Sequence, residues 1–400
     1  MNRMRFTLVL LLGSAWLGAA GPRELAAQPA PLGPEVVFLT NDFPYRPLLA
    51  VQPGGDSLLV WDDDSGSRAS IFYRFLAAGS TPADEWSPSI ESPEMYPQTK
   101  AVTATPKGFD VIWQVPPFDK PAAFYRGHLN LQGEPEGMPV RIGGTGTGWV
   151  WQVRGNGFMA GWALPKKHGI AARRLTSSGQ RTGPEMRLNS RPVDAPDAVV
   201  LAVADGGFVA VWQGAVAGST RATVLRARRF SPAGTPLGPD FDVNTVPLGA
   251  VTDLEFPDDP NYLIAAAPGG GFAVAWMRDF KIYLRFFDAA GKALGPEVSA
   301  VTADSTEALA SMAFDDRGNL LLLWRLSGEE YHDLQIQLFD PHGAPLGPPE
   351  FVRSAASDIY QVPVQGSVAW TGDSWLVAWI AAGLPQGDFL TILVRRFAAK

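Results

Sequence analysis

The chain has 400 residues, contains no cysteine and carries a formal net charge of −7 at pH 7. The lack of cysteine excludes a disulfide-stapled fold, so a chain of this length must be stabilised by burying apolar side chains. The acidic balance and the lack of a recognisable basic stripe argue against nucleic acid or an anionic membrane as a partner.

The N-terminal segment has the anatomy of a secretory signal. Arg3 and Arg5 precede an apolar stretch at 6–12, and small residues follow up to Ala20. Because the apolar stretch is short, it favours export over a membrane anchor. We expect cleavage after Ala20 or Ala27, so that 1–27 is a signal peptide with a short leader. Residues 28–400 are then a single domain, exported to the periplasm or secreted by a bacterium, without stable membrane insertion.

A short phrase recurs seven times along the rest of the chain: a turn, an apolar stretch and then tryptophan. The steps between these tryptophans run from 48 to 64 residues, a period that indicates a propeller or another repeat architecture. A residue repeated at one register is usually structural, so we expect the indoles to lie in the core. The copies end at Trp61, Trp113, Trp162, Trp212, Trp276, Trp324 and Trp379.

The fourth copy shows the predicted unit most clearly. Strands are expected at 198–203, 208–212, 224–230 and 236–243, with a tight glycine turn at 205–207. Alternate residues of the second strand are apolar on both sides, so both faces of the sheet must be covered. A four-stranded antiparallel propeller blade, packed between two neighbours, meets that requirement.

The two ends of the chain complement each other. The C-terminal LVRRFAAK stops where the other copies continue with a Pro-Leu-Gly-Pro phrase, and that phrase stands at 31–34. We therefore expect 32–37 to pair with 393–397 and close the ring, which hides two sheet edges. The predicted fold is all-β: a seven-bladed β-propeller of four-stranded antiparallel blades.

The repeat resembles one found in secreted bacterial β-propeller proteins of mostly unassigned function, with a consensus of the type DGGFVVVW followed by RRFDxxGxPLGxEFxVNT. The match is close at 205–245, fair in the fifth to seventh copies and weak in the first two. The resemblance implies an exported propeller and brings no catalytic residues with it.

Loop length and variety concentrate on one face of the expected disc. The first-to-second and third-to-fourth connections are short and alike, whereas the second-to-third connections and those between blades are long and different in every blade. Variable loops on a rigid scaffold often carry function, although unconstrained loops also drift. Aromatic side chains there are candidates for a glycan- or peptide-binding rim, and polar clusters are candidate ligand contacts, with ordinary solvated loops as the alternative. The candidates are Tyr45, Tyr96, Phe118, Asp259, Glu330, Tyr331, His332 and Tyr360.

Signals for metal and catalytic chemistry are weak. Asp62 and Asp64 resemble the start of a calcium loop, but no glutamate follows at the twelfth position, so a solvated acidic turn is the favoured interpretation. No other cofactor is expected. The sequence contains four histidines and no nucleophile elbow, and it cannot single out two carboxylates for glycoside hydrolysis.

These observations predict a monomeric, non-enzymatic binding or scaffold protein that recognises a protein, peptide or glycan through its variable-loop face. The alternative is an extracellular polysaccharide hydrolase or lyase with its site at the central mouth of that face. A purely structural envelope component is a third possibility. Fold class alone does not decide among them, because propellers host both enzymes and binding proteins.

Overall fold

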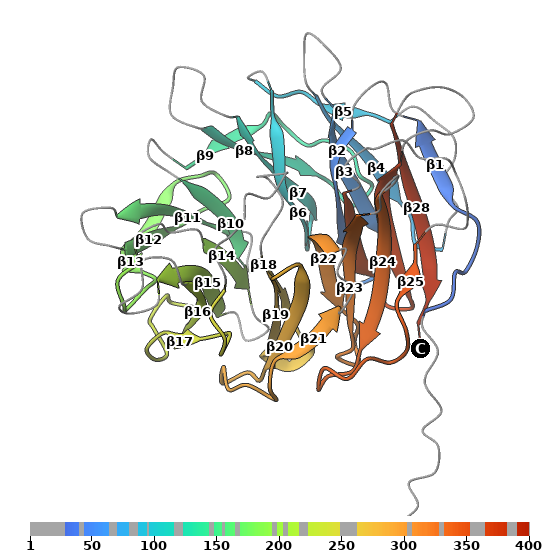
Figure 1. The fold of residues 1–400 in the computed structure, drawn as a ribbon. Coiled ribbons are helices and arrows are strands. Elements are labelled where there is room, and N and C mark those ends of the chain that lie inside the picture. The colour runs from blue at the N-terminus through green and yellow to red at the C-terminus, as the bar shows by residue number, and fades with distance from the viewer. Residues whose placement is uncertain are drawn as a thin grey trace, which may run out of the picture.

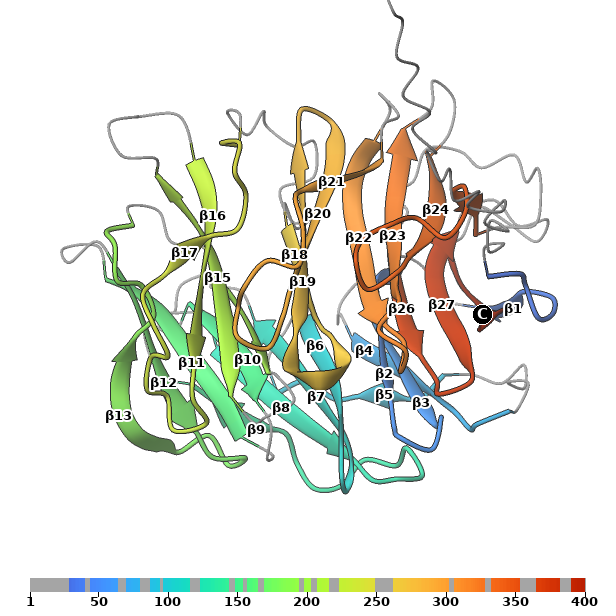
Figure 2. The same ribbon diagram turned by 90° about the horizontal axis from the view of Figure 1, so that it is seen from below.

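The chain folds as a ring of β-sheets in the computed structural model. Over the described residues the strands form seven four-stranded antiparallel sheets, and the one helical segment is a 3-10 turn, η2 (Pro268–Gly270) (Figures 1 and 2). The predicted seven-bladed β-propeller is confirmed. The structure describes residues 29–39, 44–63, 70–79, 87–93, 96–115, 123–143, 148–153, 157–164, 169–193, 198–202, 207–215, 223–248, 262–301, 306–327, 332–352, 365–381 and 390–399.

Each blade follows the chain from its first strand to its fourth, except the seventh, which takes its fourth strand from the N-terminal part. Blade 1 contains β2 (Pro44–Val51), β3 (Ser57–Asp63), β4 (Ser70–Leu76) and β5 (Ser89–Ile90). Blade 2 contains β6 (Gln98–Thr105), β7 (Gly108–Val115), β8 (Ala123–Leu129) and β9 (Val140–Ile142). Blade 3 contains β10 (Trp149–Val153), β11 (Gly157–Leu164), β12 (Gly169–Leu175) and β13 (Arg181–Arg187). Blade 4 contains β14 (Ala198–Ala202), β15 (Phe208–Ala215), β16 (Thr223–Phe230) and β17 (Phe241–Asp242).

The remaining blades complete the circle. Blade 5 contains β18 (Tyr262–Ala266), β19 (Phe272–Arg278), β20 (Lys281–Phe287) and β21 (Val298–Val301). Blade 6 contains β22 (Thr306–Phe314), β23 (Leu320–Ser327), β24 (His332–Phe339) and β25 (Glu350–Phe351). Blade 7 contains β26 (Gly366–Trp370), β27 (Ser374–Ala381), β28 (Thr391–Ala398) and β1 (Val36–Leu39). The first strand of each blade contacts the first strands of both neighbouring blades, so these strands surround the axis of the ring.

The ring closes through the two ends of the chain, as predicted. β1 pairs antiparallel with β28, with Val37 opposite Leu393. Two hydrogen bonds extend the pairing beyond β1: the Leu32 amide donates to the Arg396 carbonyl at 2.9 Å, and the Ala398 amide donates to the Ala30 carbonyl at 2.7 Å. In Figure 1 the blue strand β1 therefore lies beside the red strand β28.

The blades pack through apolar side chains on both sheet faces. In β15, Phe208, Ala210 and Trp212 join a buried cluster with side chains of blade 3, whereas Val209 and Val211 join one with blade 5. This alternation confirms the prediction that both faces of a blade are covered.

Six of the seven repeated tryptophans are buried, but Trp162 in blade 3 is only half-buried. The prediction that every copy lies in the core is therefore wrong for this blade. The apolar cluster between blades 2 and 3 includes Phe158 and Ala160 of β11 and does not extend to Trp162. Blade 3 instead packs two indoles of its first strand toward blade 4: Trp149 stacks on Trp151 with ring centroids 6.0 Å apart.

The fourth strands are shorter than expected. Residues 236–243 of blade 4 were predicted to form one strand, but the ladder covers only β17, with an isolated bridge between Pro236 and Phe230. Pro236 and Pro239 have no amide hydrogen to donate, so the Pro-Leu-Gly-Pro phrase cannot form a continuous ladder.

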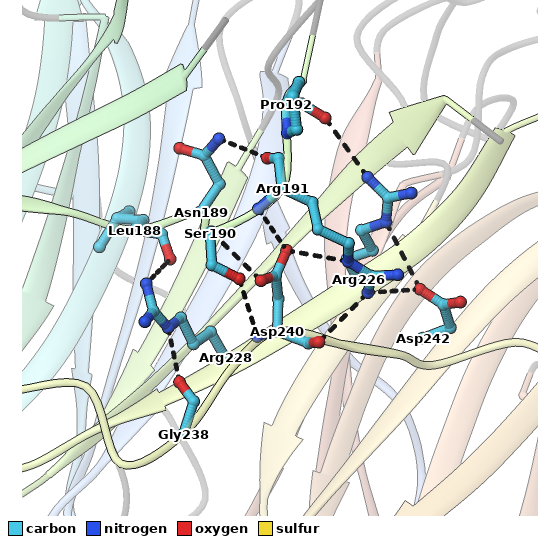
Figure 3. Close-up of polar contacts among 10 residues, drawn as sticks. All are labelled: Leu188, Asn189, Ser190, Arg191, Pro192, Arg226, Arg228, Gly238, Asp240 and Asp242. Carbon is cyan, nitrogen blue, oxygen red and sulfur yellow. Dashed lines mark hydrogen bonds and ion pairs between the residues drawn. The ribbon is translucent and has the colours of Figure 1, made fainter. Parts of the chain in front are cut away.

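An arginine of the third strand joins that phrase to the preceding blade. In blade 4 the Arg228 guanidinium donates from Nε to the Gly238 carbonyl at 2.8 Å and from Nη1 to the Leu188 carbonyl of blade 3 at 3.4 Å (Figure 3). It also lies 5.6 Å from the centroid of the Phe230 ring. Arg285 and Arg395 make the same pair of bonds in blades 5 and 7.

The acidic residue after the Pro-Leu-Gly-Pro phrase makes a second bridge. The Asp240 carboxylate accepts hydrogen bonds from the backbone amides of Ser190 and Arg191 in blade 3, at 3.2 and 3.3 Å (Figure 3). Glu297 of blade 5 accepts from Thr245 of blade 4 in the same way. Although burial alone would raise the pKa of Glu297, hydrogen bonds from Thr245 and Arg278 hold that pKa below its ordinary value. The repeated Arg, Gly-Pro-acid and Asn-Thr positions thus join neighbouring blades.

Removing the arginine bridge should destabilise the ring. We expect Arg228→Ala to lower the free energy of unfolding by about 2–3 kcal/mol, because two carbonyls lose a charged donor. Arg229→Ala is the matched control, since alternation along β16 directs this neighbour to the opposite face of the sheet. Urea unfolding of both variants tests the assignment, and an equal loss in the two would contradict it.

Candidate functional site

The described parts of the variable-loop face bring polar and aromatic residues together where blades 1 and 2 meet. Asp62 lies near the end of β3, Tyr45 near the beginning of β2 and Thr99 near the beginning of β6. All three positions are at the ends of strands that open toward this face. Because β2 and β6 are first strands, the group borders the central mouth of the ring. We call Tyr45, Arg46, Asp62, Tyr96 and Thr99 the mouth cluster.

The Asp62 carboxyl is buried and connects the two blades. Its oxygens accept from the Thr99 amide at 2.9 and 2.8 Å, and one of them is hydrogen-bonded to the Thr99 hydroxyl. Burial raises the pKa of Asp62 to about 6, although the hydrogen bonds from Thr99 and the positive charges of Arg46 and Lys100 lower it. The neutral acid also fits this environment, because the Thr99 hydroxyl can accept a hydrogen bond as well as donate one.

This raised pKa makes the stability of the fold depend on pH. A carboxyl that holds its proton more tightly in the folded state stabilises the fold at low pH, and that stabilisation is lost as the pH rises through about 6. A shift of about two pKa units corresponds to about 3 kcal/mol.

We therefore expect Asp62→Asn to match the wild type near pH 4 and to be more stable by up to about 3 kcal/mol at pH 8. The amide can still accept from the Thr99 amide and donate to its hydroxyl. Urea titrations at the two pH values measure the difference. Asp279→Asn, an exposed carboxyl between β19 and β20, is the control and should retain the wild-type pH dependence. An Asp62→Asn variant that is no more stable at pH 8 would contradict the burial argument.

The backbone around Asp62 is strained. Arg46 and Tyr96 have φ angles of +52° and +56°, in the left-handed region that side chains other than glycine seldom adopt. β2 and β6 also shift register here, between Tyr45 and Leu48 and between Thr99 and Ala101. The Arg46 amide donates to the Gln365 side chain of blade 7 at 2.7 Å, which ties three blades together. Strain and bulges of this kind are concentrated at functional sites.

Tyr45 gives the mouth cluster an accessible aromatic ring. It is 41% exposed and lies directly opposite Asp62 in the β2–β3 ladder, so the two side chains share one face of the sheet. The cluster can thus offer an aromatic contact beside a carboxyl that changes charge near pH 6. The structure brings together two residues that the sequence analysis singled out separately, Tyr45 and Asp62, and a third, Tyr96, lies three residues before Thr99 in the chain.

The other predicted site residues are not tested by the described structure. His332 is the first residue of β24, and only its backbone is described. The remaining candidates lie outside the described residues; they are Asp64, Phe118, Asp259, Glu330, Tyr331 and Tyr360. Within the described part of the chain, no three His, Asp or Glu side chains gather closely enough to hold a metal ion, and no helix there is long and apolar enough to cross a bilayer.

Three further statements of the sequence analysis need correction. Asp62 does not lie in a solvated turn, because it belongs to β3 and its side chain is buried against Thr99. The second-to-third connection is not long in every blade, because β19 and β20 are joined by the two-residue turn Asp279–Phe280 with both φ angles positive. Nor does the chain lack a basic region, since blade 3 has a marked excess of arginine and lysine. The net charge of the whole chain concealed that excess, although a count blade by blade reveals it. The sequence analysis also did not predict Arg46 and Thr99 as site residues, because neither belongs to a recognisable motif.

Comparison with known proteins adds no functional assignment. No protein-family model matches the sequence, and no curated protein matches it significantly. Among solved structures, a protein of unknown function from Dyadobacter fermentans aligns at 12% identity and a TM-score of 0.47, covering 92% of this chain and 98% of that one. A candidate 6-phosphogluconolactonase from Bacteroides uniformis aligns at 14% and 0.46, covering 84% and 94%. The PQQ-bound aldose sugar dehydrogenase from Streptomyces coelicolor aligns at 14% and 0.38, covering 92% and 100%. Similarity this low supports no inference about the activity of this chain.

Proposed function

We propose that this protein is a non-enzymatic propeller that is exported and binds a protein, peptide or glycan through its variable-loop face, with the mouth cluster as part of the binding site. The observation that carries the proposal is the exposed Tyr45 ring, which precedes the left-handed backbone of Arg46 and lies opposite the buried Asp62. The repeated residues of the blades, by contrast, are used in bridges between neighbours. A ligand would therefore be recognised by residues that the repeat leaves free to vary.

Binding assays on the mature protein test this proposal. Glycan and peptide arrays identify a ligand, and we expect Tyr45→Ala to weaken its binding by about tenfold or more, because truncating a central aromatic contact commonly costs more than 1 kcal/mol. Leu237→Ala is the control, since Leu237 is similarly exposed, at 51%, in the third-to-fourth hairpin of blade 4 on the opposite face. This location would be refuted if Tyr45→Ala left the affinity for the ligand unchanged, or if Leu237→Ala lowered that affinity equally.

The raised pKa of Asp62 favours a second candidate function, a polysaccharide hydrolase or lyase, because a carboxyl that stays protonated near pH 6 can act as a general acid. This function requires that the wild-type protein cleave a polysaccharide and that Asp62→Asn abolish the cleavage. If Asp62→Asn binds the ligand normally, and neither it nor the wild type forms a product, the result supports the binding function instead.

A further inference from the structure

Blade 3 differs in charge from the rest of the chain. Residues 148–193 contain eight Lys and Arg residues and a single carboxylate, Glu185, although the whole chain carries −7. Blade 6, across the ring, shows the opposite balance, with two Lys or Arg residues and eight Asp or Glu residues over 306–352. The disc therefore has an electropositive side and an electronegative side, and such an arrangement steers charged partners.

Two of the described arginines of blade 3 are engaged by blade 4. Arg191 forms ion pairs with Asp240 and Asp242, at 3.4 and 2.7 Å (Figure 3). Arg174 donates to the Pro232 carbonyl and lies 5.7 Å from the centroid of the Phe208 ring. These two arginines are accounted for by packing between the blades.

Three further arginines share the other side of the sheet, which faces blade 2. Arg187 lies opposite Ala171, and Arg181 lies opposite Leu175. Arg173 falls between those two positions in β12, on the same face by alternation. Leu175 identifies this face, because it belongs to the apolar cluster between blades 2 and 3. Arg181 and Arg187 are exposed, and Arg173 is half-buried. We call Arg173, Arg181 and Arg187 the arginine stripe.

The half-buried Trp162 lies in line with this stripe. In β11 it is opposite Ala171, which is in turn opposite Arg187, so the three residues form one row across the blade. Small residues make room beside the row: a Cβ on Gly169 would come within 3.0 Å of the Arg187 guanidinium. Blade 3 is thus the one described blade in which the repeated tryptophan remains partly accessible, and arginines stand on the same face.

We propose that the arginine stripe and Trp162 form a binding surface for an acidic polysaccharide, one that carries carboxylate or sulfate groups. Guanidinium groups form bidentate hydrogen bonds with these anions, and an indole ring stacks on the apolar face of a sugar. The stripe is one blade wide, and no other blade has a comparable excess of Lys and Arg over Asp and Glu, so the stripe fits a single narrow chain. A nucleic-acid duplex is wider and more densely charged, and it would meet the carboxylates of neighbouring blades. This surface is separate from the mouth cluster and extends beyond the function proposed above.

Salt-dependent binding tests the proposal directly. The full-length mature protein is titrated with polygalacturonate, with dextran sulfate and with neutral dextran, at 50 and 200 mM NaCl. We expect binding to one or both acidic polymers and none to neutral dextran. With three charge contacts, the affinity should fall roughly twentyfold between the two salt concentrations. The variant Arg173→Gln/Arg181→Gln/Arg187→Gln should bind the acidic polymers weakly at both salt concentrations and lose this salt dependence. Trp162→Ala should weaken the binding of polygalacturonate more than the binding of a polyphosphate of equal charge.

A variant with the same change in charge elsewhere provides the control. Lys107→Gln/Lys292→Gln/Arg317→Gln removes three exposed cations from turns of blades 2, 5 and 6 and should leave binding unchanged. The proposal fails if neither acidic polymer binds at 50 mM NaCl, if both triple variants lose affinity equally, or if a DNA duplex binds more tightly than the polysaccharides. Tyr45→Ala should not alter binding to the stripe, so this result and that for the mouth cluster can be told apart.

Discussion

Replacing Trp276 with alanine is expected to lower the free energy of unfolding by about 3–5 kcal/mol, the range found when a large aromatic side chain is deleted from a packed core. Trp276 is fully buried between blades 4 and 5 and stacks on Tyr283, with ring centroids 6.1 Å apart. Its indole N–H has no hydrogen-bond partner among the described residues. The loss should therefore come from packing and cavity formation rather than from a broken hydrogen bond.

The blade 3 copy of the same position provides a matched control. Trp162 occupies the equivalent register but is only half-buried, so Trp162→Ala should cost clearly less than Trp276→Ala. Urea unfolding followed by fluorescence and circular dichroism measures both. Equal losses in the two variants would show that the burial of the repeated tryptophan does not determine its contribution.

Joining β1 to β28 by a disulfide is expected to raise stability by up to about 5 kcal/mol, because the bond closes a loop that contains nearly the whole chain. The native sequence has no cysteine, so an engineered pair has no competing partner. The pairs Val36→Cys/Val394→Cys and Val37→Cys/Leu393→Cys both lie directly opposite in the ladder. Antiparallel pairs alternate between wide and narrow spacing, so one of the two should suit disulfide geometry better.

Oxidation of each double variant, followed by thiol counting and urea unfolding, checks this expectation. A reduced sample of the same protein is the reference for stability. Failure of both pairs to form a bond in the folded protein would contradict the observed register and, with it, the closure of the ring.

The sequence was most informative where a signal repeats. Seven copies of one phrase predicted seven blades, and the split Pro-Leu-Gly-Pro phrase predicted the pairing of 32–37 with 393–397. Both predictions rest on periodicity, which survives errors in single elements. The shorter β17 shows where local detail failed, because proline positions were read as part of a strand.

The candidate sites were less predictable, because their residues meet only in the folded ring. Tyr45 and Asp62 were singled out from the composition of their loops, but the link from Asp62 to Thr99 joins two blades and leaves no local pattern. The left-handed backbone at Arg46 likewise breaks the usual residue preference. The arginine stripe was overlooked because a net charge summed over 400 residues averages out a single basic blade.

The pairing of β1 with β28 also bears on when the protein can reach its native state. β1 is synthesised long before β28, so blade 7 cannot assemble until β28 has emerged. Contacts this remote in sequence form slowly. Until then β1 has no partner strand and presents unpaired edges to other chains, which is a known route to aggregation.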